Sequence, residues 1–273
     1  MSTITIIRPK DKFNLSDFRE IWQYKELLYF LTWRDLKVRY KQTFIGVAWV
    51  LFQPLMSMVI FTIFFGNFAQ LPTDGAPYPI FVFFGLLFWQ FFSASLSDIS
   101  GCLIANQNII SKVYFPRILL PLSMIMTRLV DFLVACLILI GLMIYYHFVP
   151  SFIGLLIFPV LVAVAAMAAL GLGLFLSALN VKYRDVRYVL PYFIQMMMFV
   201  TPVVYSSSIL GKYSWVLAIN PIAGVIKTAR SEFLQSYATN WMQFGISTLA
   251  CIVMLVIGWL YFRRRERQSV DLF

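Results

Sequence analysis

Long stretches without a charged side chain constrain this 273-residue sequence more than any other feature. Such runs cover residues 42–73, 75–97, 132–181, 188–211 and 233–262. Because a helix needs about 20 apolar residues to cross the hydrocarbon core of a bilayer, the runs provide roughly five to six crossings. The composition agrees, since 61% of the residues are hydrophobic and 12% are charged, which excludes a water-soluble domain.

Backbone inside a bilayer must satisfy its own hydrogen bonds, so we expect an all-α membrane protein. Turn signals and charged loops divide the runs into six predicted transmembrane helices, at 43–65, 80–101, 118–146, 154–179, 188–205 and 242–262. They form one transmembrane domain over residues 43–262. A cytoplasmic N-terminal segment (1–42) precedes it and a basic cytoplasmic tail (263–273) follows it.

The positions of the cations predict the orientation. Eighteen Lys and Arg residues fall in the N-terminal segment, the loop that ends at 117, the loop 180–187 and the tail, against three on the opposite side. This asymmetry follows the positive-inside rule. We therefore expect both termini of a multi-pass protein to lie in the cytoplasm.

Residues 24–41, ahead of the first span, are expected to form a helix. One face of this helix carries the apolar side chains of Leu27, Leu28, Leu31 and Val38. Asp35 intrudes on that face and is placed to pair with Arg39 at i+4. The pattern predicts an interfacial helix on the inner leaflet. A lead-in helix docked on a partner is the alternative.

Several kinds of chemistry have no matching motif in the sequence. No G-x-x-x-x-G-K-[ST] phosphate loop occurs, and the single histidine, His147, cannot build a multi-histidine metal site. Gly171 and Gly173 lie in an apolar run without a following Lys, so we expect them to allow close helix packing. We expect a protein that is not an enzyme and that binds no metal or cofactor of its own.

Arg128 and Asp131 are predicted to lie well inside a span. They are three residues apart, and therefore on the same side of one helix. Charges inside a membrane are costly and mark either function or mutual neutralisation. The spacing favours a structural ion pair, and a contact with the substrate is the alternative.

Two predicted cytoplasmic loops, 111–117 and 180–187, each combine cations, a tyrosine and an apolar residue. Tyr and Arg concentrate binding energy at protein interfaces, so the loops suit docking to a soluble partner. A solvated loop is the simpler interpretation.

At these positions the sequence resembles the permease subunits of ABC-2 type ATP-driven exporters, most closely the polysaccharide and O-antigen export branch. The matching stretches are WRDLKVRY at 33–40, GVAW at 46–49 with Gln53-Pro54, KVYFPR at 112–117 and YRDV at 183–186. The resemblance extends from about Trp33 to the basic tail. Each stretch alone is weak, whereas their order and spacing are specific to the superfamily.

The resemblance implies a homodimer above two copies of a separate ATPase subunit, which would bind ATP and Mg²⁺. It implies an interfacial helix that includes Trp33, Arg34, Asp35 and Arg39, and a cytoplasmic coupling helix at about 105–117. Residues expected to couple the chain to the ATPase are Asn108, Lys112, Tyr114, Phe115, Pro116, Arg117, Tyr183, Arg184 and Asp185. The implied substrate is a lipid-diphosphate-linked glycan exported across the inner membrane, with no nucleic-acid partner.

The resemblance also implies short gate helices on the far side, within about 206–241. Here Asn220-Pro221 precedes a helix-like stretch that would place Ile222, Val225, Ile226, Ala229 and Phe233 on one apolar face. Lys227 and Arg230 would lie off that face. We expect this stretch to rest against the bilayer surface or a channel mouth.

Aromatic residues make up 18% of the chain. Because sugar rings pack on aromatic faces, some of these residues suit the lining of a glycan path, although lipid-facing belts explain many others. The candidates are Trp49, Gln53, Phe88, Trp89, Gln195 and Phe199.

Three functional hypotheses follow. The first is the permease subunit of a lipid-linked polysaccharide exporter. The second is the same architecture exporting teichoic acid, capsule, a lipid or a drug. The third is a self-sufficient carrier or channel, which would work without an ATPase partner.

Overall fold

The computed structural model describes residues 22–41, 47–183, 185–235 and 238–268, and these contain helices and turns but no β-strand. The elements are α2 (Lys25–Lys41), α3 (Val47–Phe61), η1 (Thr62–Phe68), α4 (Tyr78–Ala105), α5 (Gln107–Ile110), α6 (Leu119–Tyr145), α7 (Phe152–Lys182), α8 (Val186–Val200), η2 (Ser207–Ile219), α9 (Pro221–Leu234) and α10 (Trp241–Gln268). The predicted first span begins at 43–46, outside the described residues. The same holds for Arg184 and for the ends of the terminal segments.

Within the described ranges, five segments are long and apolar enough to cross a membrane. They are Ala48–Phe68, Tyr78–Ala105, Leu119–Tyr145, Phe152–Lys182 and Trp241–Arg265. The predicted fifth span corresponds to α8, which has 15 residues. At 1.5 Å per residue it covers about 22 Å, less than the roughly 30 Å of a hydrocarbon core. The helix stops because Thr201 adopts an extended conformation just before Pro202.

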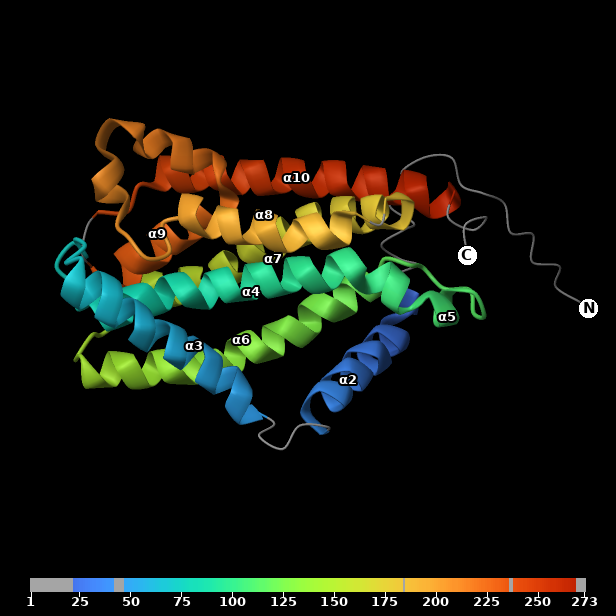
Figure 1. Ribbon diagram of the computed structural model, residues 1–273, viewed down its shortest axis with the longest axis horizontal. Helices are drawn as coiled ribbons and strands as arrows, with labels where there is room; N and C mark the ends of the chain where they lie inside the picture. The colour runs from blue at the N-terminus through green and yellow to red at the C-terminus, as the bar shows by residue number, and fades with distance from the viewer. Residues whose placement is uncertain (1–21, 42–46, 184, 236–237, 269–273) are drawn as a thin grey trace, which may run out of the picture.

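Helix α4 lies at the centre of the bundle and contacts α3, α6, α7, α8 and α9 (Figure 1). Its sequence is rich in aromatic residues, and most of its side chains are buried. Phe88 packs against Phe132 of α6 and Phe158 of α7, with ring centroids 5.4 and 6.0 Å apart. Aromatic side chains from three helices thus form the core of the protein.

Glycines bring α7 and α10 into close contact, as the sequence predicted for Gly171. A Cβ on Gly258 of α10 would overlap the carbonyl oxygen of Gly171, and a Cβ on Gly171 would lie 2.7 Å from the backbone nitrogen of Leu255. Gly173 faces Ile99 of α4, where a Cβ would lie 2.6 Å from the side chain. The explanation of these glycines by helix packing is confirmed.

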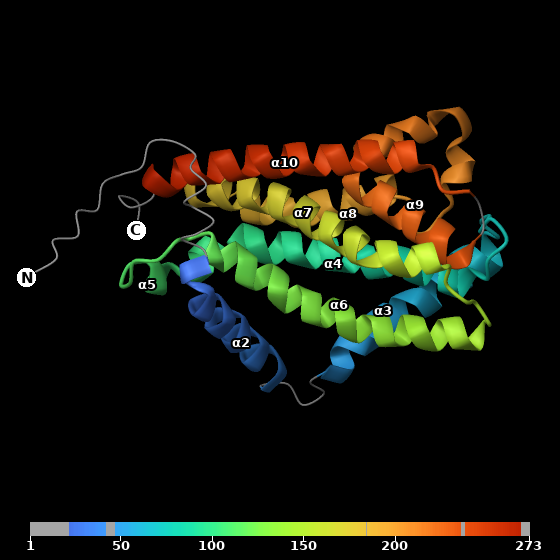
Figure 2. The ribbon, with the colours of Figure 1, turned by 180° about the vertical axis from the view of Figure 1, so that it is seen from behind.

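Helix α9 begins as its sequence predicts. Asn220 accepts hydrogen bonds from the backbone nitrogens of Ile222 and Ala223, and Pro221 occupies the first helical position. The helix packs against α4, α7 and α10 at the end of the bundle opposite α5 (Figure 2). Almost all of its side chains are buried. It is therefore an internal element and does not rest on a surface.

The position of Arg230 in α9 differs from the sequence prediction. Its side chain is 2% exposed and lies over the ring of Phe81. It donates hydrogen bonds to the carbonyl oxygens of Phe81 (3.0 Å), Pro202 (2.7 Å) and Val203 (2.5 Å). The prediction that Arg230 points away from the buried side was wrong, because backbone carbonyls at the ends of α4 and α8 bind it inside the protein. Lys227 is half-buried and donates to Gln243 at 2.6 Å.

Candidate functional site

A cavity of about 840 Å³ lies between α3, α4, α6 and α8, at the C-terminal end of α2. The polar residues that line it are Arg39, Tyr40, Gln53, Gln90, Ser93, Ser97, Arg128 and Asp131. The apolar residues that line it are Trp49, Val50, Pro54, Leu87, Phe91, Ala94, Phe132, Ala135, Pro191 and Ile194. The volume is within the range of about 300–1,000 Å³ that is typical of small-molecule sites.

The predicted channel-lining residues divide into three groups. Trp49 and Gln53 line this cavity. Gln195 and Phe199 are exposed on α8 but are not among the lining residues. Phe88 and Trp89, at 0% and 4% exposure, are packed inside the protein core. The prediction that Phe88 and Trp89 line a channel is corrected, because both side chains pack against neighbouring helices and neither lines the cavity.

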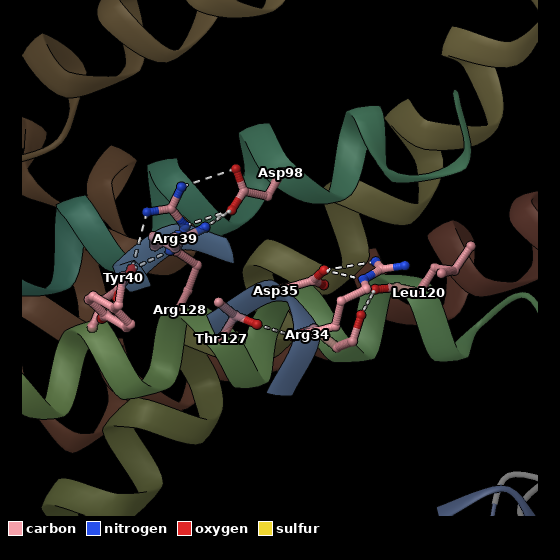
Figure 3. Close-up of polar contacts among 10 residues, drawn as sticks. Arg34, Asp35, Arg39, Tyr40, Asp98, Leu120, Thr127 and Arg128 are labelled. Carbon is pink, nitrogen blue, oxygen red and sulfur yellow. Dashed lines mark hydrogen bonds and ion pairs between the residues drawn. The ribbon is translucent and has the colours of Figure 1, made fainter. Parts of the chain in front are cut away.

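Four charged residues form a cluster beside the cavity. Figure 3 labels three of them, Arg39, Asp98 and Arg128. Arg128 of α6 binds Asp98 of α4 through Nε and Nη2, at 2.7 and 3.0 Å. Arg39 of α2 binds Asp131 of α6 at 2.5 Å and Asp98 at 3.2 Å. The four side chains are 13% to 27% exposed, so they are only partly screened by solvent. We call Arg39, Asp98, Arg128 and Asp131 the charge cluster.

The charge cluster contains the Arg128–Asp131 ion pair expected from the sequence and adds Asp98 and Arg39 to it. Arg128 does contact Asp131, but at 3.3 Å, and its closer partner is Asp98. Sequence reasoning missed Asp98 because it ends an uncharged run and was counted near a span boundary. Its position inside the predicted span 80–101 was the available signal. The expected Asp35–Arg39 pair was also wrong: Asp35 pairs with Arg34 at 2.7 Å, and Arg39 reaches the charge cluster.

Tyr40 joins the charge cluster through a hydrogen bond from its hydroxyl to Asp131. Burial, together with this bond to a carboxylate, raises the pKa of Tyr40 above its ordinary value. The phenol therefore stays protonated at neutral pH and acts as a donor. Through Arg39 and Tyr40, the end of α2 is bound to α4 and α6.

The rest of α2 packs only partly as predicted. Leu31 is buried in a hydrophobic cluster, and Leu27 and Leu28 pack against that hydrophobic cluster. Val38 is 56% exposed. A second, exposed face carries the aromatic side chains of Trp22, Tyr29, Phe30 and Trp33. The face with Leu27, Leu28 and Leu31 packs on the rest of the protein. The face with the four aromatic side chains is left exposed.

The predicted coupling segment forms a short helix, α5, followed by turns at the same end of the bundle as the turn between α7 and α8 (Figure 1). Asn108, Lys112 and Tyr114 are exposed, while Pro116 and Arg117 are half-buried. Phe115 is 6% exposed and packs in a cluster with Leu31, Leu119 and Phe262. Phe115 therefore fixes the segment, and its neighbours face outward.

A hydrogen bond connects α2 to the coupling segment. Arg34 donates to the side chain of Asn106 at 2.9 Å, which ties α2 to the start of that segment.

Tyr183 and Asp185 are exposed in the turn between α7 and α8. Lys182 lies over the Tyr183 ring and lowers the pKa of that tyrosine.

Known proteins match most of the chain. The profile of the family described as ABC-2 type transporter matches residues 26–234. An O-antigen export system permease protein of Klebsiella pneumoniae is 30% identical over 248 residues, 90% of this chain and 95% of that protein. One of Myxococcus xanthus is 30% identical over 257 residues, covering 93% and 97%. A polysialic acid transport protein of Escherichia coli is 22% identical over 238 residues, covering 85% and 91%.

Proposed function

Since the chain belongs to the ABC-2 type transporter family, we propose that it is the permease subunit of an ATP-driven exporter of a lipid-linked polysaccharide of the O-antigen type. The observation that carries this proposal is the cavity, which is lined by charged and amide side chains together with aromatic rings. A lipid-linked glycan has the same division, because its linker is charged and its sugar rings and lipid are partly apolar. Two relatives named for O-antigen export, at 30% identity, support the substrate class.

The energy for export would come from a separate ATPase. The sequence has no phosphate-binding loop of the G-x-x-x-x-G-K-[ST] type. Asn108 of α5 and Lys112 and Tyr114 just after it are exposed, and Asp185 lies at the same end of the molecule. These side chains suit docking to such a subunit. In this arrangement that end lies in the cytoplasm and the protein sits in the inner membrane.

A homodimer would complete the path. Exposed apolar side chains cover α3, including Trp49, Phe52 and Met56, and α8, including Tyr192 and Met196. These two helices flank the cavity on one protomer. In a homodimer they would meet their copies, and the cavity would become part of a shared channel. Helix α8, with the turn after Val200, would then serve as the fifth of six crossings.

On the far side, the exposed segment η2 is the better candidate for a gate. It contains Gly211, whose φ of 46° and ψ of −116° interrupt the helix. Ile209 and Trp215 are 51% and 64% exposed, whereas Ile222, Ile226 and Phe233 of α9 are buried. Asn220, which donates to Thr201 at 2.9 Å, and Pro221 would form the fixed base of the gate.

Two substitutions in the coupling segment test the ATPase partnership. Tyr114→Ala removes an exposed ring and should leave thermal stability within about 0.5 kcal/mol of wild type while weakening capture of the ATPase partner. Phe115→Ala removes a buried ring and should cost about 3–5 kcal/mol of stability. A permease that exports its substrate without any ATPase would favour a self-sufficient carrier instead.

A second substrate has one observation in its favour. The Escherichia coli relative is named for transport of polysialic acid, at 22% identity. Export of a capsule-type polymer by the same architecture is therefore the alternative. The glycan that accumulates inside cells lacking this gene separates the two substrates.

A further inference from the structure

A turn between η1 and α4 holds the start of η2 through one carboxylate. Asp74 accepts hydrogen bonds from the hydroxyls of Ser206 and Ser208, which lie 132 and 134 positions further along the chain. We propose that the contact of Asp74 with Ser208 is a latch, which keeps the gate closed and must open in each export cycle. The inference rests on the proposed function of η2 as the gate and names the contact that controls it.

The turn that carries Asp74 has a defined backbone. The hydroxyl of Thr73 donates to the carbonyl oxygen of Ala76 at 2.6 Å, and the backbone nitrogen of Ala76 donates to the carbonyl oxygen of Thr73 at 3.3 Å. Between them, Asp74 and Gly75 have φ values of 55° and 92°. Aspartate and glycine are among the residues that tolerate such left-handed conformations. The turn therefore fixes the backbone of Asp74 while its side chain reaches η2.

The linker between α8 and η2 is anchored from inside the protein. Arg230 donates to the carbonyl oxygens of Pro202 and Val203, at 2.7 and 2.5 Å. The hydroxyl of Tyr78 donates to the carbonyl oxygen of Val204 at 2.7 Å. These residues are all buried. Moving the linker would leave buried carbonyl groups unpaired, so we do not expect it to move with the gate.

The far end of η2 is anchored as well. Ser247 of α10 is buried and donates to the carbonyl oxygen of Ala218 at 2.9 Å. Leu217 and Ala218 are each 5% exposed. Between this end and the linker lies Gly211, whose left-handed backbone interrupts the helix and lets it act as a joint, because glycine has no Cβ to clash there. We call residues 207–211 the flap.

The latch is the contact that can open between these two anchors. Ser206 is buried at the end of the linker and keeps the carboxylate of Asp74 in place. Ser208 and Ile209 belong to the flap and are exposed, and Asp74 is half-buried. Water can therefore replace the hydrogen bond between Ser208 and Asp74 when the flap moves away. Local opening is expected where hydrogen bonds are exposed and buried contacts are few.

Cross-linking tests whether the latch must open. Asp74→Cys and Ser208→Cys are combined in a cysteine-free background and joined with a short, reducible bis-methanethiosulfonate reagent before reconstitution. The proteoliposomes contain the ATPase partner and a fluorescent lipid-diphosphate-linked oligosaccharide. We expect transport to fall at least about tenfold below that of the same variant before cross-linking, and to recover on reduction. Full transport with the latch completely cross-linked would overturn the proposal.

A second cysteine pair is the matched control. Ser151 donates to Glu232 at 3.1 Å, and both side chains are half-buried. Ser151→Cys with Glu232→Cys, cross-linked in the same way, should transport at the rate it had before treatment, because neither residue belongs to η2. A fall as large as that of the latch pair would mean that cross-linking blocks transport unspecifically, and it would also overturn the proposal.

Spin labels follow the flap without any transport. A nitroxide is attached at Ile209→Cys in the flap or at Trp215→Cys in the second part of η2. Asp74→Ala should raise the mobility of the label at 209 and leave that at 215 unchanged. Ser208→Ala should have the same effect from the other side, while it keeps the attraction of Asp74 for Lys227. Unchanged mobility at 209 in both variants would contradict the latch.

The outcome is separable from that of the proposed function. If wild type and its ATPase move no lipid-linked glycan, the proposed function fails, and the spin labels still decide on the latch. If the glycan crosses equally well with the latch cross-linked, the latch fails and the proposed function stands.

Discussion

Arg128 of α6 binds Asp98 of α4 through two nitrogens, at 2.7 and 3.0 Å, although Asp131 is its neighbour on the same helix. Removing either partner leaves a partly buried charge without its closest counter-ion. We predict that Asp98→Asn and Arg128→Gln each cost about 1–3 kcal/mol, below the value for fully buried pairs because a quarter of each side chain is exposed. Thermal unfolding in detergent measures the loss.

The double variant distinguishes this pair from independent charges. Asp98→Asn combined with Arg128→Gln should lose less stability than the sum of the two single losses, by about 1 kcal/mol or more. Asp131→Asn with Arg128→Gln should show a smaller coupling, since their contact is longer. Strict additivity of Asp98 and Arg128 would show that the two do not act as a pair.

Arg230 holds three chain segments together inside the protein. Arg230→Ala would leave the carbonyl oxygens of Phe81, Pro202 and Val203 without this donor, each at a cost of about 1–3 kcal/mol. We expect little folded protein from this variant, and more from Arg230→Lys. The yield of monodisperse protein after size-exclusion chromatography measures the effect. Arg264→Ala, at an exposed position of α10, is the control and should behave like wild type.

Two glycines of α10 provide a matched test of helix packing. Gly258→Ala would place a methyl group against the carbonyl oxygen of Gly171, so we expect a loss of about 1–3 kcal/mol. Gly245→Ala meets nothing within 4 Å and should be neutral or stabilising by up to about 1 kcal/mol. The thermal midpoint of Gly258→Ala should therefore fall below that of wild type, whereas the midpoint of Gly245→Ala should not. Equal midpoints would contradict the close contact of α7 and α10.

The gate assignment to η2 predicts a pattern of thiol labelling. Cysteines that replace Ile209 or Trp215 in a cysteine-free background should react with an impermeant maleimide applied from outside the cell. Cysteines that replace Ile222 or Ile226 of α9 should stay unreactive, because both positions are fully buried. Trapping the ATPase with nucleotide should change labelling in η2 alone. Helical periodicity of labelling along α9 would restore α9 as the surface gate.

Local sequence signals predicted much of the fold. Uncharged runs located five of the candidate spans, since the requirement for apolar length acts on each helix separately. The helix after Asn220-Pro221 was predicted from the apolar period of the following residues, and α9 begins there. The fifth span was expected to be longer, because hydropathy does not register the extended turn at Thr201.

The site depended on contacts between distant residues and was harder to predict. The helical period placed Arg230 off an apolar face, but it could not show that carbonyls of Phe81 and Val203 would surround it. Phe88 was expected in a channel, because aromatic content alone does not distinguish a core from a lining. The pairing of Arg39 with Asp131 joins residues 92 positions apart.

Reconstituted transport tests the central claim most directly. The permease and its ATPase partner are placed in proteoliposomes with a fluorescent lipid-diphosphate-linked oligosaccharide. Movement of this glycan across the bilayer is followed by its accessibility to a membrane-impermeant glycan-modifying enzyme. We predict that the glycan crosses only when both subunits and hydrolysable ATP are present. Movement of the glycan by the permease alone, or no movement with the complete system and ATP, would contradict it.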